Sequence, residues 1–217
     1  MSNLSDMMLT ISIWTLPVLL AVTLHEAGHA YMAYRCGDDT AARAGRLSFN
    51  PLVHVDPFGT VLLPLLLIFM QTGFVFGYAR PVPVYRSRLK NLPRDSILVS
   101  LAGPGANVLI ALVSSFFLVL AMKFGVDRDG WLMQVLAVCV GFNCILAVFN
   151  MIPVPPLDGG RILVDLLPYN AAQAFSQIER FGIFIVLAIV LLVPGLVWGM
   201  ADGLAGLLFG LWAGVLL

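Results

Sequence analysis

Apolar runs of membrane-spanning length dominate the pattern of hydrophobic and polar positions. An α-helix needs about 20 consecutive apolar residues to cross a bilayer. The runs that approach this length occupy residues 11–34, 97–122, 131–152, 178–193 and 197–217. Together with an ambiguous stretch at 60–76, they predict an all-α polytopic membrane protein with about five to six transmembrane helices.

The stretch 60–76 is short and is interrupted by Pro64 and Gly73. Basic residues lie on both sides of it: Arg35, Arg43 and Arg46 before it, and Arg80, Arg86, Arg88, Lys90 and Arg94 after it. Because short loops rich in Lys and Arg stay in the cytoplasm, both flanks are predicted to be cytoplasmic. We therefore expect a re-entrant hairpin at 60–76 and an amino terminus outside. A hairpin of the last two helices then leaves the carboxyl terminus inside.

The composition agrees with a membrane protein. Hydrophobic residues make up 60% of the chain and charged residues 11%, whereas soluble domains carry about 25% charged residues. The net charge is zero, so no nucleic-acid partner is expected. Cys36, Cys139 and Cys144 form no CxxC pair and are predicted to be small packed hydrophobes. Residues 1–217 are predicted to form a single domain, with a core at about 11–167 and a helical hairpin at about 178–217.

The run HEAGH places His25 and His29 four residues apart within the first apolar run, with Glu26 beside them. Residues four apart share one face of a helix, so both imidazoles can reach one metal ion. This HExxH pattern is typical of zinc-dependent hydrolases, in which the zinc acidifies a water molecule and the glutamate accepts its proton. A chance match on a surface helix is disfavoured, because ionisable groups inside an apolar span are costly.

A catalytic zinc needs a third protein ligand, and Asp158 is the best candidate. It lies in NMIPVPPLDGG, where three prolines break the helix after an apolar run and Gly159 and Gly160 permit close backbone approach. An acid in such a break indicates an internal polar site, since irregular backbone at membrane depth is tolerated where it lines a cavity or is buried in protein. The alternative is that Asp158 caps a helix that begins near Gly159.

Other polar residues near the spans have open roles. His54 could contact substrate or stabilise an oxyanion, or it could be a hydrogen-bonded structural histidine. Asn150 could donate to a substrate carbonyl without carrying charge into the membrane, or it could bond between helices. Gly103, Gly105 and Ala106 are expected to permit close helix packing, with Asn107 bonding across the interface.

The chain resembles the site-2 protease family of intramembrane zinc metalloproteases, through HEAGH and NMIPVPPLDGG together. FNPLVHVDPFGT, GYARPVPV and LAGPGAN are similar to a compact bacterial-type branch. The resemblance implies that His25, His29 and Asp158 bind one zinc ion, that Glu26 is the general base and that Asn150 helps hold the substrate. Larger members carry a PDZ or CBS domain, for which this chain has no room, so regulation would be absent or would come from a membrane partner.

These features predict a zinc endopeptidase that cleaves transmembrane segments of other proteins in a lipid bilayer, expected to be a prokaryotic plasma membrane. A polar pocket would face the cytoplasmic side. Residues 74–84 contain Gly77, Pro81 and Pro83, which bar a long helix, so we expect either a short cytoplasmic-side strand that receives unwound substrate or an ordinary loop. The alternative functions are a non-proteolytic membrane protein that binds a helix in the same cavity, and a zinc hydrolase of small lipids or peptides.

Overall fold

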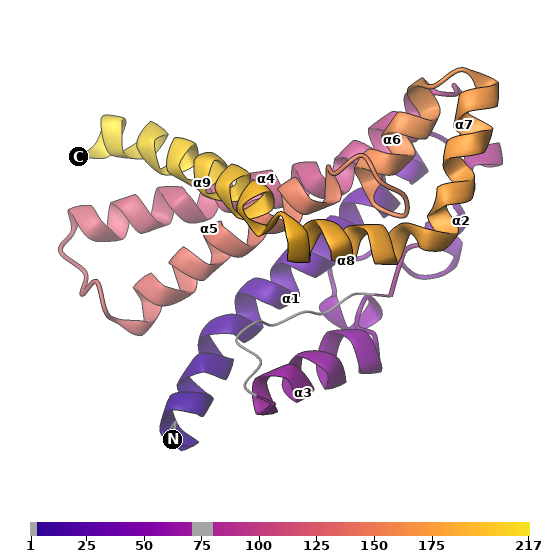
Figure 1. Cartoon of the computed structure of the whole chain (residues 1–217). Coiled ribbons are helices and arrows are strands. Elements are labelled where there is room, and N and C mark those ends of the chain that lie inside the picture. The colour runs from indigo at the N-terminus through magenta and orange to yellow at the C-terminus, as the bar shows by residue number, and fades with distance from the viewer. Residues whose placement is uncertain (1–3, 71–79) are drawn as a thin grey trace. The chain divides into compact units, whose positions relative to one another are not determined.

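The computed structural model describes residues 4–70 and 80–217, and helices make up most of this part (Figure 1). The helices are α1 Leu4–Arg35, α2 Thr40–Arg43, α3 Leu63–Phe69, α4 Arg94–Lys123, α5 Trp131–Asn150, α6 Asp158–Leu166, α7 Tyr169–Ser176, α8 Gly182–Leu192 and α9 Pro194–Leu216. Short helical turns add η1 Pro51–Val53, η2 Pro57–Leu62, η3 Arg86–Arg88 and η4 Gln177–Phe181. The predicted all-helical class is confirmed.

Four of the described helices are long and apolar enough to cross a membrane, namely α1, α4, α5 and most of α9. The expected count of five to six is not confirmed. The apolar run at 178–193 is divided between η4 and α8, and α8 has 11 residues. At 1.5 Å per residue α8 is about 16 Å long, roughly half the thickness of the hydrocarbon core.

Two expectations fall partly on residues 71–79, outside the described part of the chain. The segment 60–76 begins as η2 and continues as α3, where Asp56 caps the first turn by accepting from the amides of Phe58 and Gly59. Its remaining residues are not described, so the re-entrant hairpin stays a prediction. The small β element at 74–84 is not confirmed, because its described part, residues 80–84, has no regular structure.

The chain divides into two compact units. Val22–Gly103 is called the histidine unit here, and the helical unit comprises Pro104–Leu217 together with the residues up to Ala21. The histidine unit packs around Ala33, Cys36, Leu89 and Val99. After α1 ends, Gly37 takes a φ of +109°, which favours glycine, and turns the chain away from the helix axis.

In the helical unit α5 packs against α9, and the core contains Ala111, Val140, Cys144, Ala201 and Leu208. All three cysteines of the chain are buried and free, as predicted. The Nδ2 of Asn107 donates to Asn143 Oδ1 over 2.9 Å and to the carbonyl of Ala21 over 3.1 Å. Both asparagines are fully buried, so this network joins α1, α4 and α5 and confirms the interhelical bonding expected of Asn107.

Candidate metal centre and active site

His25 and His29 lie one turn apart on α1 within the histidine unit. Their Nε2 atoms are 3.1 Å apart and their rings meet edge to face, with centroids separated by 4.7 Å. Both side chains are buried. The helix thus aims two imidazole nitrogens at one point, as the spacing in the sequence predicted.

The second ring nitrogen of His29 has a partner on another helix. Nδ1 of His29 lies 2.7 Å from the carbonyl oxygen of Val99 on α4. A carbonyl accepts only, so this contact places a proton on Nδ1 and leaves the lone pair of Nε2 directed at the metal position. Val99 could not be predicted from the sequence, because its contribution is a main-chain oxygen, which every residue type has.

Gly103 on α4 borders the same point. A Cβ added there would lie 2.6 Å from Cε1 of His29 and 2.7 Å from Cε1 of His25, and it would clash with Nε2 of His29. The absence of a side chain therefore leaves room beside the two imidazoles where a metal ion would bind. Close packing at Gly103 was expected, but the sequence did not indicate that its neighbours are the two histidines. A Cβ at Gly105 would meet nothing within 4 Å, so close packing there is not borne out.

Asp158 is the first residue of α6 and is 5% exposed. The N-cap of α6 is Leu157, so Asp158 is not the N-cap residue that the alternative interpretation required. Gly159 and Gly160 allow the expected close backbone approach: a Cβ at Gly159 would meet the main chain of Met151, and one at Gly160 would meet that of Val154. The chain therefore turns tightly immediately before Asp158.

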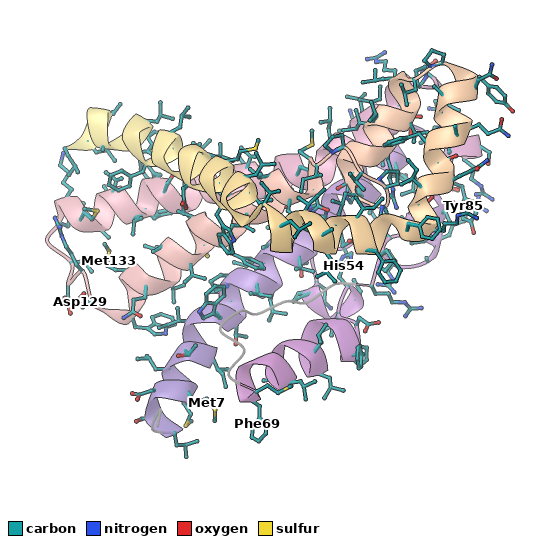
Figure 2. The ribbon with its side chains drawn as sticks, viewed as in Figure 1. Met7, His54, Phe69, Tyr85, Asp129 and Met133 are labelled. Atoms are coloured by element: carbon teal, nitrogen blue, oxygen red, sulfur yellow. The ribbon has the colours of Figure 1, made fainter. Side chains whose placement is uncertain are left out.

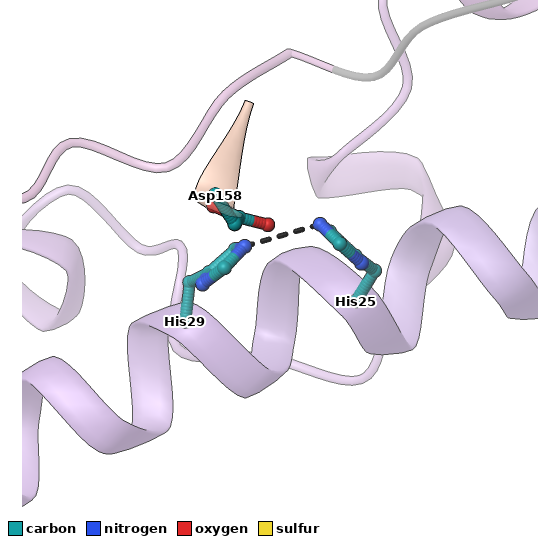
Figure 3. Close-up of side chains that lie close together, drawn as sticks. All are labelled: His25, His29 and Asp158. Carbon is teal, nitrogen blue, oxygen red and sulfur yellow. Dashed lines mark hydrogen bonds between the residues drawn. The ribbon is translucent and has the colours of Figure 1, made fainter. Parts of the chain in front are cut away.

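Among the described residues, His25, His29 and Asp158 form a group that could hold a metal ion, because their ligand atoms all lie within 4.8 Å of one another (Figure 3). Two imidazoles and one carboxylate are a donor set that catalytic zinc sites use, with the fourth position left for water. The donor set and the space beside Gly103 both fit a zinc ion.

Glu26, between the two histidines in sequence, is half-buried. Its Oε2 accepts a hydrogen bond of 2.8 Å from the main-chain amide of Val82. One carboxylate oxygen is thus held by the backbone. The sequence did not predict this contact, which joins residues 56 positions apart.

His54 and Asn150 both make hydrogen bonds within their own part of the chain. His54 (labelled in Figure 2) is 1% exposed, and its Nε2 lies 2.8 Å from the carbonyl oxygen of Ser48. This contact favours the structural alternative for His54, and His54 is not part of the metal-binding group. Asn150 is the last residue of α5, and its Nδ2 donates to Leu146 of the same helix over 3.0 Å. The substrate-binding role of Asn150 stays a prediction.

The model of peptidase family M50 matches residues 13–129 and 127–193. The chain belongs to this family. YwhC of Bacillus subtilis, which is named as a zinc metalloprotease, is 40% identical over 181 residues, covering 82% of this chain and 78% of its own length. Rip2 of Mycolicibacterium smegmatis and MJ0392 of Methanocaldococcus jannaschii, also named as zinc metalloproteases, are 32% and 26% identical. Their alignments cover 81% and 82% of this chain, and 65% and 41% of the relatives. No solved structure matches the chain.

Membership of family M50 confirms the resemblance to site-2 proteases that the two motifs indicated. The protein is a zinc metalloprotease. Family M50 is membrane-embedded, in agreement with the helices of spanning length in this chain. The alternative of a non-proteolytic binding protein is therefore not supported.

Proposed function

We propose that this M50 protease hydrolyses peptide bonds in or near transmembrane segments of other membrane proteins, with one zinc ion bound by His25, His29 and Asp158. The observation that carries the proposal is the buried histidine pair on α1, a helix of 32 residues that is long and apolar enough to span a bilayer. A metal centre on such a helix favours substrates that are themselves within the membrane.

A zinc ion held by His25, His29 and Asp158 would polarise a water molecule at neutral pH. Glu26 accepts the proton of that water as the nucleophile attacks the peptide carbonyl, and it then passes the proton to the leaving amine nitrogen. With Oε2 already bonded to Val82, the other oxygen, Oε1, is the one that receives the proton. Val99 keeps the proton of His29 on Nδ1 throughout, which preserves the lone pair on Nε2.

Asn150 is proposed to orient the substrate carbonyl. A side-chain amide has two N–H protons, and the bond to Leu146 uses one of them. The second proton can therefore be donated to substrate without breaking the first bond. Asn150→Ala should lower turnover while zinc stays bound, and loss of zinc from this variant would contradict the assignment.

The proposed location is a prokaryotic plasma membrane, with the catalytic site toward the cytoplasmic side. Relatives from bacteria and an archaeon support the first part. The basic residues between α1 and α4 support a catalytic site toward the cytoplasmic side, under the positive-inside rule. Transmembrane proteins are the expected substrates, and a membrane partner could supply regulation.

The test is cleavage of a panel of tagged single-span membrane proteins by detergent-purified wild type and Glu26→Gln, with zinc measured in the same samples. We expect cleavage by wild type alone and about one zinc per chain in both, because Glu26 is a base and not a ligand. Asp158→Ala should lose both zinc and activity. Cleavage by Glu26→Gln would remove Glu26 from the mechanism, and hydrolysis of small lipids or short peptides in place of the panel would favour the alternative hydrolase.

A further inference from the structure

The hydrogen bond from Val82 to Glu26 comes from an irregular segment, residues 80–85, which we call the strap. The strap has the sequence RPVPVY. Pro81 and Pro83 have no N–H group, so Val82 supplies the one main-chain donor among these three residues. A residue that precedes proline is restricted to extended conformations, which applies to Arg80 and to Val82. The strap is thus a stiff segment, and within its Pro81–Val82–Pro83 part the amide that bonds to Glu26 is the sole main-chain donor.

The upstream end of the strap is attached to the loop that contains His54. The amide of Arg80 donates to the carbonyl oxygen of His54 over 3.0 Å. That loop is itself held by the contact of the His54 ring with Ser48, and by a hydrogen bond from the Arg46 guanidinium to the carbonyl of Val53. The buried ring of His54 therefore supports the backbone that holds the strap.

The downstream end is attached to the turn that follows α1. The amide of Tyr85 donates to Oδ2 of Asp38 over 2.6 Å, and Oδ1 of Asp38 accepts from the amide and the hydroxyl of Thr40. Asp38 is fully buried. Further on, the amide of Lys90 donates to the carbonyl of Cys36 over 3.1 Å. Both ends of the strap are therefore attached to other parts of the histidine unit, one to the loop of His54 and one to the turn after α1.

We propose that the main-chain amide of Val82 is a positioning group for Glu26, and that the strap exists to hold this amide in place. By donating to Oε2, Val82 restrains the rotation of the carboxylate and leaves Oε1 to receive the proton of the water. This inference rests on the proposed function. It differs from the expectation of a strand that receives substrate, because it assigns the strap to the catalytic step and not to substrate binding.

The test compares Val82→Pro with Val82→Ala. Val82→Pro removes the N–H donor, whereas Val82→Ala shortens the side chain and keeps the donor. We expect kcat of Val82→Pro to fall by about 10- to 100-fold, a size typical of misplaced catalytic groups, with KM and bound zinc unchanged. Val82→Ala should stay close to wild type. A raised KM with unchanged kcat would instead assign the strap to substrate binding, and equal kcat values in both variants would overturn the proposal.

A second measurement needs no cleavage and no variant in the strap. In a peptide fragment that begins at Arg80 and ends at Tyr85, the amides that retain deuterium belong to Val82, Val84 and Tyr85, since prolines have none and the first residue of a fragment loses its label. Hydrogen exchange of this fragment should accelerate in Glu26→Ala relative to wild type, because the acceptor of Val82 is gone. Unchanged exchange would overturn the proposal even if Val82→Pro failed to fold. A wild type that cleaves nothing would refute the proposed function, yet the exchange result would still decide the Val82–Glu26 contact.

Discussion

Gly103 lies where the smallest side chain would already touch both histidine rings. Because Gly103 has no Cβ, α4 can lie close to the two rings. This close approach lets the Val99 carbonyl, one turn earlier on α4, contact His29. Val99 and Gly103 are four residues apart, so the carbonyl that contacts His29 and the space beside both rings lie on the same face of α4. The metal centre therefore depends on a residue that can neither bind zinc nor move a proton.

Gly103→Ala should reduce zinc affinity by about 10- to 100-fold, the size of effect seen when groups that support metal ligands are altered. The methyl group would enter the space beside Nε2 of His29 and force the rings apart. Zinc retained after dialysis against a graded chelator measures the change. Gly105→Ala is the matched control, because a Cβ there meets nothing within 4 Å and alanine favours the helix. Equal zinc retention in the two variants would contradict the role of Gly103 in leaving space for the metal ion.

At the scale of elements, the turn after α1 and the strap are joined through Asp38. Burial raises the pKa of this carboxyl, but hydrogen bonds from Thr40 and from the amide of Tyr85 outweigh burial, so its pKa lies below the ordinary value of 3.8. A pKa that is lower in the folded chain stabilises the fold at pH values above the unfolded pKa of about 4. This stabilisation is lost as the pH falls through the folded pKa.

Asp38→Asn should therefore destabilise the histidine unit at neutral pH, by about 1 to 3 kcal/mol, because an amide group would face donors that now meet a carboxylate. Thermal unfolding between about pH 3 and pH 7 should show that the variant loses less stability on acidification than wild type does. Turnover should also fall, since the downstream end of the strap is released. Asp39→Asn is the control: Asp39 pairs with Arg43 and Arg88 in solvent, and such pairs contribute about 0 to 1 kcal/mol. An Asp38→Asn variant as stable as Asp39→Asn would contradict this account.

The contributions of side chains to the site could be predicted from the sequence. The spacing of His25 and His29, the break before Asp158 and the buried Asn107 follow from residue type and helical periodicity, and all agree with the structure. The contributions of the main chain, namely the Val99 carbonyl and the Val82 amide, could not be predicted. These groups are the same in every residue, so their use depends on long-range packing. LAGPGAN and GYARPVPV stand out as motifs, but their residue types predict helix packing for the first, and a short strand or an ordinary loop for the second.

At the scale of the whole molecule, the number of spans decides which side of the membrane holds the carboxyl terminus. Five spanning helices and a re-entrant hairpin would place it inside, opposite the amino terminus. If the four described helices of spanning length are the crossings, both termini are expected on the same side. Two contacts of the helical unit support the second arrangement. Nζ of Lys123, at the end of α4, donates to the carbonyl of Leu216 over 2.6 Å, and Nε1 of Trp131, at the start of α5, donates to Ser12 over 3.1 Å.

These contacts bring the end of α9 to the end of α4, and the start of α5 to Ser12 of α1, within the helical unit. Residues 35–46 and 80–94 are richest in Arg and Lys and are predicted to be cytoplasmic, so we predict that the loop 124–130 and the end of α9 lie at the outer face. A reporter enzyme that is active only outside the membrane, fused after Leu217, should therefore be active, and a fluorescent protein that folds only in the cytoplasm should be dark at the same position. Reporters inserted near residue 128 should give the same pair of results, and reporters near residue 44 the opposite pair. A cytoplasmic carboxyl terminus together with an outer residue 128 would mean that α8 with its flanking residues completes a fifth crossing in the bilayer, despite its length.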